Sequence, residues 1–217
     1  CADVGEAVAG AEVIFVVTQA LGHAPMAEAL AGVIGPEQVI VVMPGSSGGA
    51  LQVRHIMNER TGVCPTVAET STLPWAARCE GERGVRIVHR VGLVKLAALP
   101  AGETARLAEV LRPVMPGVTA AGSVLETMLS NGNPVIHPAV MLLNAGTVER
   151  CGGQWEFYEE GVTPAVAEVI RAVDQERLAL GRATGVELLP EPEMSRRQGY
   201  SESADYLRAY RVGPGFQ

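Results

Sequence analysis

The sequence lacks several features that would assign it to a class of protein at once. Aromatic residues make up 4% of its 217 residues, and Lys95 is its single lysine. The net charge is −7, whereas nucleic acids and anionic membranes bind surfaces rich in Lys and Arg. Its apolar stretches are too short to span a bilayer. We therefore expect neither nucleic acid nor a membrane as a partner.

The four cysteines show neither a metal-binding nor a disulfide pattern. Cys1, Cys64, Cys79 and Cys151 lie far apart, and no Cys-x-x-Cys spacing occurs. The first residues contain neither a basic region nor an apolar core, so no signal peptide is visible. We expect no metal site, reduced thiols and a cytoplasmic protein.

Short apolar runs alternate with helical spacing in the first half of the chain. Residues 12–17 and 38–42 are predicted strands, and residues 23–34 between them place apolar side chains at helical intervals. Strand, helix and strand in this order, with strands that are apolar throughout, predict a parallel sheet covered on both faces. A helix over residues 49–60 and a short strand over residues 67–69 follow.

The second half is predicted to be mainly helical. Residues 85–96 favour an extended segment or a hairpin, and residues 103–111 favour a helix that leads into this part. Thr163 and Pro164 are a helix cap and a first-turn proline, and Gly185 is a stop signal. The sequence therefore predicts one long helix between the cap and the glycine.

One histidine lies where a turn-rich segment meets a predicted helix. Residues 131–136 are turn-rich and polar, and they lead to His137 and Pro138, which suits the first position of a helix. The positive end of the helix dipole would disfavour the imidazolium there, and an imidazole exchanges protons near neutral pH. We interpret His137 as a catalytic acid–base. The alternative is a boundary histidine that only satisfies backbone groups.

Three elements of the sequence together resemble the octopine/nopaline (opine) dehydrogenase family. Residues 131–138 are similar to its Asn-Pro…His-Pro element, and residues 69–78 to its Glu-Thr-x-x-Leu-Pro…Arg stretch. Residues 166–180 match the long helix that follows the histidine. The resemblance implies an oxidoreductase that condenses an amino acid with a 2-oxo acid and reduces the resulting imine with NAD or NADP as cofactor, forming an opine.

The resemblance also implies a chain truncated at both ends. A dinucleotide-binding sheet uses a Gly-x-Gly-x-x-Gly turn, which is absent here and in the family lies upstream of residues 12–17. The family's Arg-Tyr-x-x-Glu-Asp element, which binds the substrate carboxylate and pairs with the histidine, is also absent. We expect an α/β protein with a partial Rossmann-type, doubly wound parallel sheet over residues 1–120. An incomplete helical substrate or catalytic domain is expected over residues 121–217.

Loops that follow the predicted strands supply candidates on the ligand-binding edge of the sheet. The resemblance implies that the loop after the first strand touches nicotinamide or the 2-oxo acid, so Gln19 is a substrate candidate and Thr18 a cofactor candidate. Pro44 and Gly45 form either a plain turn or a wall of the cofactor cleft. His23 begins a helix, where we expect a cap or a contact with solvent.

Four further residues are candidates for substrate binding. A hydroxyl of Thr70 or Thr72 could donate to a substrate carboxylate, and the alternative is turn chemistry. Asn133 belongs to the approach to His137. Trp155 either lines an amino-acid pocket or packs between domains. The remaining histidines, His55 and His89, are expected on the surface.

Two other readings stay open. A related dehydrogenase of simple 2-oxo acids or alcohols would often use a lysine as acid–base, and Lys95 lies in an apolar extended stretch. A non-catalytic ligand-binding or structural protein would need neither the glycine turn nor the Arg-Tyr element. The sequence names neither the amino acid nor the 2-oxo acid, and it does not separate NADH from NADPH. A homodimer stays among the options for the oligomeric state.

Overall fold

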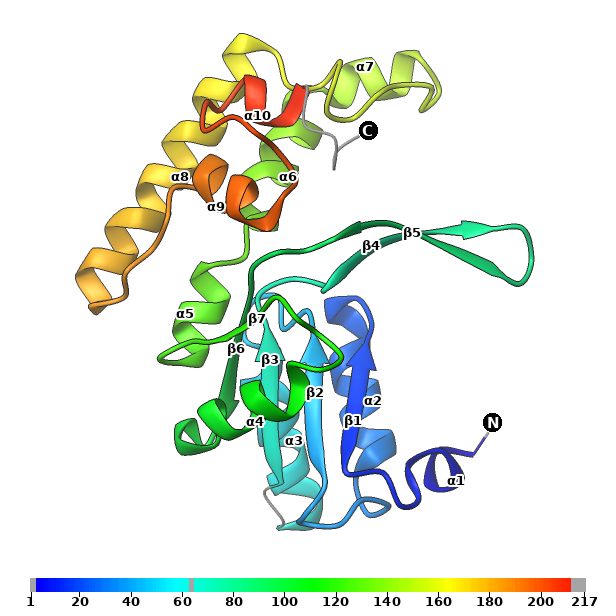
Figure 1. Ribbon diagram of the computed structural model, residues 1–217. Coiled ribbons are helices and arrows are strands. Elements are labelled where there is room, and N and C mark those ends of the chain that lie inside the picture. Colours follow the sequence, from blue (N-terminus) through cyan, green and yellow to red (C-terminus); the bar gives the residue numbers. More distant parts are fainter. Residues whose placement is uncertain (1–2, 63–64, 212–217) are drawn as a thin grey trace. The chain divides into compact units, whose positions relative to one another are not determined.

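The computed structural model describes residues 3–62 and 65–211 (Figure 1). The chain splits into two compact units. Unit 1 is formed by Cys1–Leu73 and Val94–Asn131, and unit 2 by Pro74–Leu93 and Gly132–Gln217. The chain therefore passes from one unit to the other three times, after Leu73, after Leu93 and after Asn131.

Unit 1 is built on a five-stranded sheet in the order β1-β2-β3-β6-β7. Its strands are β1 (Val13–Val17), β2 (Val39–Met43), β3 (Thr66–Thr70), β6 (Val94–Leu99) and β7 (Val118–Ala120). The first three are parallel, β6 runs antiparallel to β3, and β7 is parallel to β6. The predicted α/β class is confirmed, with a sheet that is mixed rather than wholly parallel.

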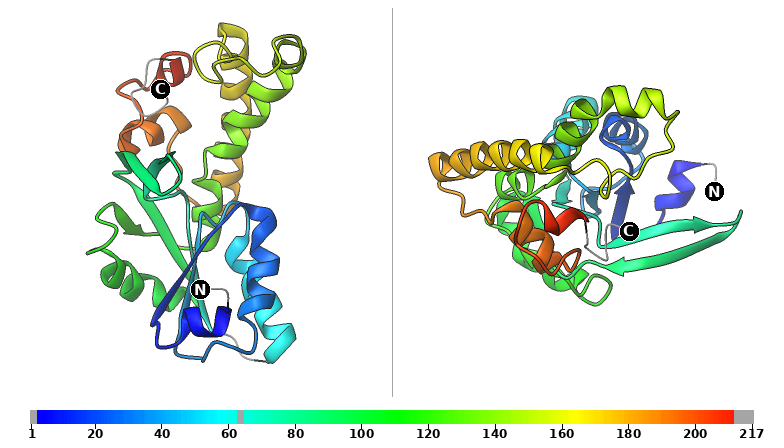
Figure 2. Two further views of the ribbon diagram at one scale, coloured as in Figure 1. Left: turned by 90° about the vertical axis from the view of Figure 1, so that its right-hand side faces the viewer. Right: turned by 90° about the horizontal axis from the view of Figure 1, so that it is seen from above.

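Helices cover both faces of this sheet. Helices α2 and α3 pack against each other on one face, and α4 lies on the other (Figure 2). The helices of unit 1 are α1 (Val4–Val8), α2 (His23–Leu30), α3 (Gly49–Thr61), α4 (Thr104–Leu111) and α5 (Val124–Leu129), with 3-10 turns at Ala20–Gly22 and Ala101–Glu103. α2 ends before the predicted residue 34, because the backbone is extended at Ala31 and Gly32 follows with a φ of 83°.

The apolar strands are buried to different extents. All five residues of β2 are buried, as expected for a strand with a neighbour on either side. β1 is an edge of the described sheet, and there Phe15 and Val17 are 41% and 59% exposed while Val16 is buried. The prediction that both faces are covered therefore holds for β2 and is wrong for β1.

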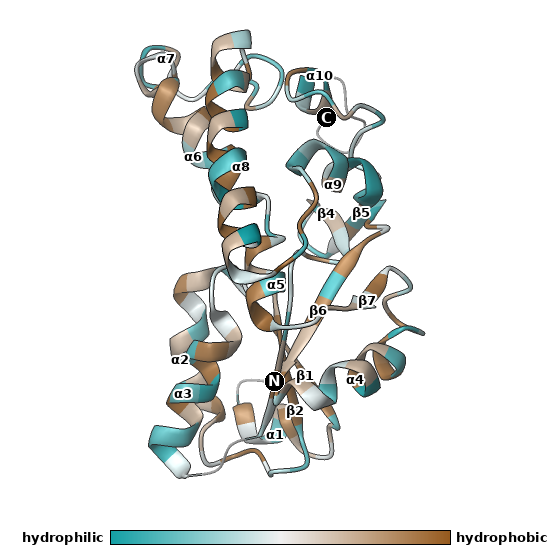
Figure 3. Cartoon of the chain, turned by 90° about the vertical axis from the view of Figure 1, so that its left-hand side faces the viewer, coloured by the Kyte–Doolittle hydropathy of each residue, from teal (hydrophilic) through white to brown (hydrophobic). Residues whose placement is uncertain are grey.

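Unit 2 contains a helical part and a two-stranded hairpin. Its elements are β4 (Trp75–Glu80), β5 (Gly84–Arg90), α6 (Asn133–Leu143), α7 (Ala145–Arg150), α8 (Pro164–Thr184), α9 (Glu191–Gln198) and α10 (Arg208–Arg211). Apolar residues of α6 and α8 share a core with Tyr210. Helix α8, with alternating apolar and polar bands in Figure 3, begins and ends as predicted. Thr163 caps its first turn by accepting from the N–H of Val166, and Gly185 ends it with a φ of 72°.

The hairpin differs from the prediction. β4 was not expected, and the extended segment predicted over residues 85–96 divides between β5 and β6. His89 was expected on the surface, but it is half-buried and its ring lies 5.0 Å from that of Tyr200. Its Nε2 lies 2.8 Å from the carbonyl oxygen of Gln198, which also accepts from the N–H of Gly92. These contacts fasten the base of the hairpin to the end of α9.

Three further expectations from the sequence concern the cysteines, membrane-spanning helices and metal ligands. Cys79 and Cys151 are free thiols, and Cys1 and Cys64 lie outside the described residues. Within residues 3–62 and 65–211, no helix has the length and apolar character needed to cross a membrane. The same residues contain no group of three or more His, Cys, Asp or Glu side chains placed to hold a metal ion.

Candidate active site

His137 lies inside a helix, one turn later than predicted. The N–H groups of Val135 and Ile136 both donate to the carbonyl of Gly132, at 3.0 and 3.1 Å, so α6 begins at Asn133. Pro134 occupies the first turn, where a proline is well tolerated, and Pro138 lies within the helix. The prediction that His137 stands at the helix mouth is therefore wrong. The groups around the His137 side chain, and not the helix dipole, therefore determine its protonation state.

Aromatic side chains surround the imidazole. Nε2 of His137 lies 3.1 Å from the hydroxyl oxygen of Tyr158. The ring of Phe157 meets the imidazole edge-on, with centroids 5.3 Å apart and planes at 72°. Burial lowers the pKa of His137, since an imidazolium would lose its hydration in this setting. The imidazole is therefore held in the neutral form, which can accept a proton.

The segment that carries these aromatics is tied to α6. The side-chain amide of Asn144 donates to the carbonyls of Val140 and Gly161, at 2.8 and 3.0 Å. A Cβ on Gly161 would lie 2.3 Å from the carbonyl oxygen of Phe157 and 2.4 Å from the ring of Trp155. Glycine is thus required where the segment closes on itself, and this closure fixes the aromatics beside His137.

Unit 1 gathers the other candidates at one edge of its sheet. Loops follow the carboxyl ends of three adjacent parallel strands, with Thr18 after β1, Gly45 after β2 and Thr70 at the end of β3. The N–H of Gly45 donates to the carbonyl of Thr70 at 2.9 Å, which joins two of these loops. The hydroxyl oxygen of Thr70 is buried and has no hydrogen-bond partner among the described residues. Such an edge is where open α/β sheets bind ligands.

A buried carboxylate organises this edge. Glu69 accepts from the N–H of Ala50 in the first turn of α3 at 2.9 Å and from the hydroxyl of Thr127 at 2.6 Å. A Cβ on Gly45 would lie 2.4 Å from the Glu69 carboxyl. Burial raises the pKa of Glu69, and the bonds from Thr127 and Ala50 oppose this shift. Glu69 is therefore a side-chain cap that joins β3, α3 and α5.

His23 is buried in unit 1 instead of capping α2 in contact with solvent. Its side chain is 1% exposed, and its ring lies against Gly49, where a Cβ would approach Nδ1 to 2.8 Å. Burial lowers the pKa of His23, opposed by a bond to the Pro44 backbone. The expectation of a solvent contact is wrong, because the α3 N-terminus packs directly on this imidazole.

Comparison with known proteins decides the family. A family model described as "NAD/NADP octopine/nopaline dehydrogenase, alpha-helical domain" matches residues 120–215. The opine dehydrogenase of Arthrobacter sp. (strain 1C) is 38% identical over 181 residues, which cover 83% of this chain and 50% of that protein. The chain belongs to the opine dehydrogenase family. The resemblance inferred from the sequence is confirmed.

Other members of the opine dehydrogenase family agree with this assignment. The opine dehydrogenase of Haliotis discus hannai is 25% identical over 210 residues, which cover 89% of this chain and 49% of that protein. A structure of octopine dehydrogenase in complex with NADH and agmatine superposes with a TM-score of 0.76 at 20% identity, covering all of this chain and 58% of the other. NADP+-bound yersinopine dehydrogenase gives a TM-score of 0.69 at 15% identity, covering 87% and 48%. The chain spans about half the length of the curated relatives it matches.

The candidates of this opine dehydrogenase family member form one group in each unit. In unit 1, Gln19 is exposed, and Thr72 and Pro44 are half-buried beside the buried Gly45. In unit 2, Asn133 is exposed as the first residue of α6, and Trp155 is half-buried. The Trp155 ring meets Phe157 edge-on with centroids 5.8 Å apart, so within unit 2 it extends the aromatic cluster that begins at His137.

A buried polar cluster in unit 2 connects α8 to α9. Asp174 and Arg177 lie three residues apart on α8 and form an ion pair at 2.7 Å, and both are buried. Asp174 also accepts from the Glu191 N–H at 2.9 Å and from the Tyr206 hydroxyl at 2.6 Å. Arg177 donates to the Leu189 carbonyl at 2.6 Å. The pair therefore helps to hold α8 against the segment that leads into α9.

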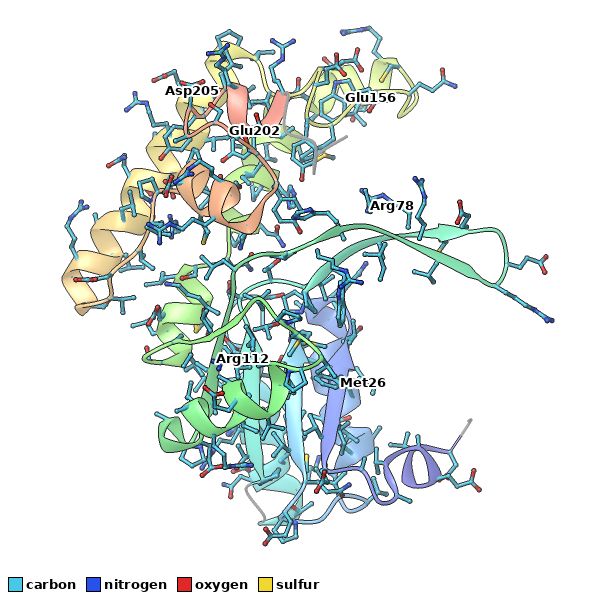
Figure 4. The ribbon with its side chains drawn as sticks, viewed as in Figure 1. Met26, Arg78, Arg112, Glu156, Glu202 and Asp205 are labelled. Carbon is cyan, nitrogen blue, oxygen red and sulfur yellow. The ribbon has the colours of Figure 1, made fainter. Side chains whose placement is uncertain are left out.

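Sequence reasoning missed two site residues, Tyr158 and Glu191. Tyr158 lies in the segment 154–161, in which only Trp155 was a candidate from the sequence. The acidic residues of this segment are typical of a solvated loop, and Glu156 is indeed exposed (Figure 4). Glu191 lies between two prolines at a helix start, a typical surface pattern, yet it is buried and accepts from Ser195 and Tyr210. Alternating acidic and aromatic residues close after the histidine motif were the available signal for Tyr158.

Proposed function

We propose that this chain takes part in the reductive formation of an opine. The amine of an amino acid adds to the carbonyl of a 2-oxo acid, water leaves to give an imine, and NAD(P)H reduces the imine. Support comes from the family membership and from one observation in particular. The histidine of the family motif is a half-buried, neutral imidazole that lies beside the aromatic side chains of Phe157 and Tyr158 in unit 2.

His137 would move the protons of the condensation. Addition of an amine to a carbonyl requires a proton to reach the carbonyl oxygen and a proton to leave the nitrogen, and the hydroxyl must then depart as water. A neutral imidazole accepts a proton, and the imidazolium that forms returns it to the departing oxygen, so one residue serves both steps. The aromatic side chains cover part of the imidazole and so reduce its contact with water.

The edge of unit 1 fits one end of a nicotinamide cofactor. It offers the turn at Pro44 and Gly45 and the Thr18 side chain. These residues would hold the nicotinamide end, and the bound cofactor would supply the hydride. A pyrophosphate contact is not assigned, since it uses a glycine turn that these 217 residues do not contain. Solved relatives were captured with NADH and with NADP+, and both remain candidates here.

Small molecules are the proposed partners. Structures of octopine dehydrogenase contain agmatine, L-arginine or pyruvate. For this chain we propose an amino acid and a 2-oxo acid, with Gln19 and a hydroxyl of Thr70 or Thr72 at the substrate carboxylate. Asn133 and Trp155 would contact the amino acid. The net charge of −7 supports small molecules over nucleic acid.

The proposal includes an organisation in two domains. A dinucleotide-binding domain would cover residues 1–120, and a helical substrate domain would cover residues 121–217. The free thiols of Cys79 and Cys151 support a reducing, cytoplasmic setting. A homodimer is one option for the assembly.

The lysine-based alternative is less well supported. Nζ of Lys95 is engaged with Glu126 at 2.7 Å, and both side chains belong to unit 1 and are largely buried. A lysine held in such a pair is already occupied as a hydrogen-bond donor. Among the residues that the structure describes, no ion pair involves His137.

The test is an assay that requires both substrates. The protein expressed from its complete gene is mixed with NADH or NADPH, a 2-oxo acid such as pyruvate, and a panel of amino acids. We expect cofactor oxidation only when the amino acid and the 2-oxo acid are both present, with the N-(carboxyalkyl)amino acid as product by mass spectrometry. Oxidation with the 2-oxo acid alone, yielding the 2-hydroxy acid, would instead support a simple 2-oxo acid dehydrogenase.

A further inference from the structure

Arg78 lies on the side of the hairpin that is turned toward the helices of unit 2 (Figure 4). Side chains alternate along a strand, so Arg78 shares one face of β4 with Ala76. Ala76 is paired with His89 across the hairpin, and His89 contacts Gln198 and Tyr200 of the helical part. The face of the hairpin that carries Arg78 is therefore the face that meets the helices.

The base of the hairpin is closely packed on the end of α9. A Cβ on Gly199 would lie 2.8 Å from Cε1 of His89, and a Cβ on Gly92 would lie 3.0 Å from the carbonyl oxygen of Arg197. Both contacts need glycine, because any larger residue would push the hairpin away from the helix. Arg78 stands close to this packed base, so the backbone that presents its side chain is held in place.

Arg78 forms no ion pair with any residue in the ranges 3–62 and 65–211. Its side chain is exposed, and one N–H of the guanidinium donates to the carbonyl of Ala77 at 3.1 Å. Arg86 lies directly opposite on β5 and differs, since its Nε is 3.8 Å from a carboxylate oxygen of Glu80. The same face of the hairpin therefore carries one arginine in an ion pair and one outside any pair.

The charge of Arg78 acts on a side chain that contacts His137. Burial raises the pKa of Tyr158 to about 12, the charges of Glu191 and Tyr200 act in the same direction, and the charge of Arg78 opposes this rise. A charge shifts a pKa in this way only when it lies near the titrating group. The Tyr158 hydroxyl oxygen is 3.1 Å from Nε2 of His137, so the guanidinium lies near the His137 site.

The acidic residue whose charge acts on the same hydroxyl is engaged elsewhere. Glu191 is buried, and its carboxylate accepts from the hydroxyls of Ser195 and Tyr210. Arg78 is exposed and makes no ion pair with it. The guanidinium is therefore open to a carboxylate that a bound ligand supplies.

We propose that Arg78 binds the carboxylate of the amino-acid substrate. Both substrates of the proposed function carry a carboxylate, and a guanidinium binds this group through two parallel N–H donors. Arg78 belongs to the same unit as Asn133 and Trp155, which are proposed to contact the amino acid. The candidates of unit 1 are then left for the carboxylate of the 2-oxo acid. This inference rests on the proposed function, and it names the group that selects an amino acid over a simple amine.

The test uses an amine that lacks the carboxylate. In the full-length protein, the amino acid of the panel with the highest turnover is compared with the amine in which hydrogen replaces its carboxyl group, as agmatine does for L-arginine. We expect Arg78→Gln to raise KM for the amino acid by about 10- to 100-fold, the scale of a charge-assisted hydrogen bond. KM for the 2-oxo acid should stay parental. The amine should react equally in the parent and in Arg78→Gln, because it has no carboxylate to lose.

Two further arginine variants serve as controls. Arg86→Gln removes an arginine from the same face of the hairpin, directly opposite Arg78 but already paired with Glu80, and should keep the parental KM. Arg78→Lys keeps the charge without the planar pair of donors, so its KM should lie between those of the parent and Arg78→Gln. Equal effects in both glutamine variants, or an equal loss with the amine, would assign the effect to the hairpin as a whole and overturn the proposal.

The outcomes separate this inference from the proposed function. A parent protein that forms no N-(carboxyalkyl)amino acid would remove the proposed function and the role of Arg78 with it. If the parent forms this product and Arg78→Gln keeps the parental KM for the amino acid, only the role of Arg78 is removed. A rise in KM for the 2-oxo acid alone would also contradict the assignment, because the bound carboxylate would then belong to the other substrate.

Discussion

Glu69 caps helix α3 from a neighbouring strand, with its carboxylate 2.9 Å from the backbone nitrogen of Ala50. Side-chain caps usually come from the residue just before a helix, and here that position is Gly48, which offers no side chain. The carboxylate also accepts from Thr127, so the three elements that frame the ligand-binding edge of unit 1 depend on one buried group.

The first prediction tests this arrangement through Gly45. A Cβ at this position would lie 2.4 Å from the Glu69 carboxyl, so Gly45→Ala should displace the cap and destabilise unit 1 by about 1–3 kcal/mol, the usual cost of overpacking. Native-state hydrogen exchange at the amides of β2 and β3 measures the effect. Gly102→Ala is the control, because its Cβ would meet nothing within 4 Å. Equal protection in both variants would contradict the role assigned to Glu69.

The second prediction concerns the ion pairs of α8. Asp174→Ala leaves Arg177 buried without its carboxylate and removes the partner of Tyr206, so we expect a loss of about 3–5 kcal/mol. Glu168→Ala removes a pair of equal spacing from the same helix, but Glu168 and Arg171 are exposed, so this variant should unfold at nearly the same urea concentration as the parent. Urea unfolding followed by tryptophan fluorescence reports unit 2, which contains both tryptophans. Similar losses would mean that burial of the pair does not matter.

The third prediction is a pH dependence that arises from Glu191. Burial raises the pKa of its carboxyl from 4.5 to about 7, against hydrogen bonds from Tyr210 and Ser195. A folded-state pKa above the unfolded one means that the stabilisation is complete below the unfolded value and is lost as pH rises through about 7. Unit 2 should therefore resist urea better at about pH 5 than at about pH 8. Glu191→Gln should reduce this difference, and an undiminished difference would assign it to another group.

Local signals in the sequence predicted those parts of the fold that local chemistry decides. Thr163, Pro164 and Gly185 mark the ends of α8 because caps and stops act within a few residues of the helix end. The apolar run over residues 38–42 predicted a strand covered on both faces, because each of its side chains is apolar, and β2 is buried along its length. In α6, both Pro134 and Pro138 suit a first turn; the sequence interpretation placed the helix start at Pro138, but the helix begins at Asn133 with Pro134 in its first turn.

Contacts between distant residues were not predictable in this way. Glu69 and Thr127 are 58 residues apart, and His137 and Tyr158 are 21 apart, so no spacing rule links them. The burial of His23 depends on the α3 N-terminus packing against it. The family motif did identify His137, whereas the partner that faces its Nε2 required the three-dimensional structure.

The central claim is that His137 is the acid–base of opine formation. Its most direct test compares His137→Ala with His55→Ala, an exposed histidine, in the full-length protein. Steady-state oxidation of NAD(P)H is followed with a 2-oxo acid and an amino acid. We predict that His137→Ala lowers turnover by roughly 10²- to 10⁴-fold, the usual scale for losing a general acid–base, with little change in cofactor affinity. His55→Ala should retain parental turnover. Turnover of His137→Ala within a few-fold of the parent would contradict the account and place the acid–base residue elsewhere.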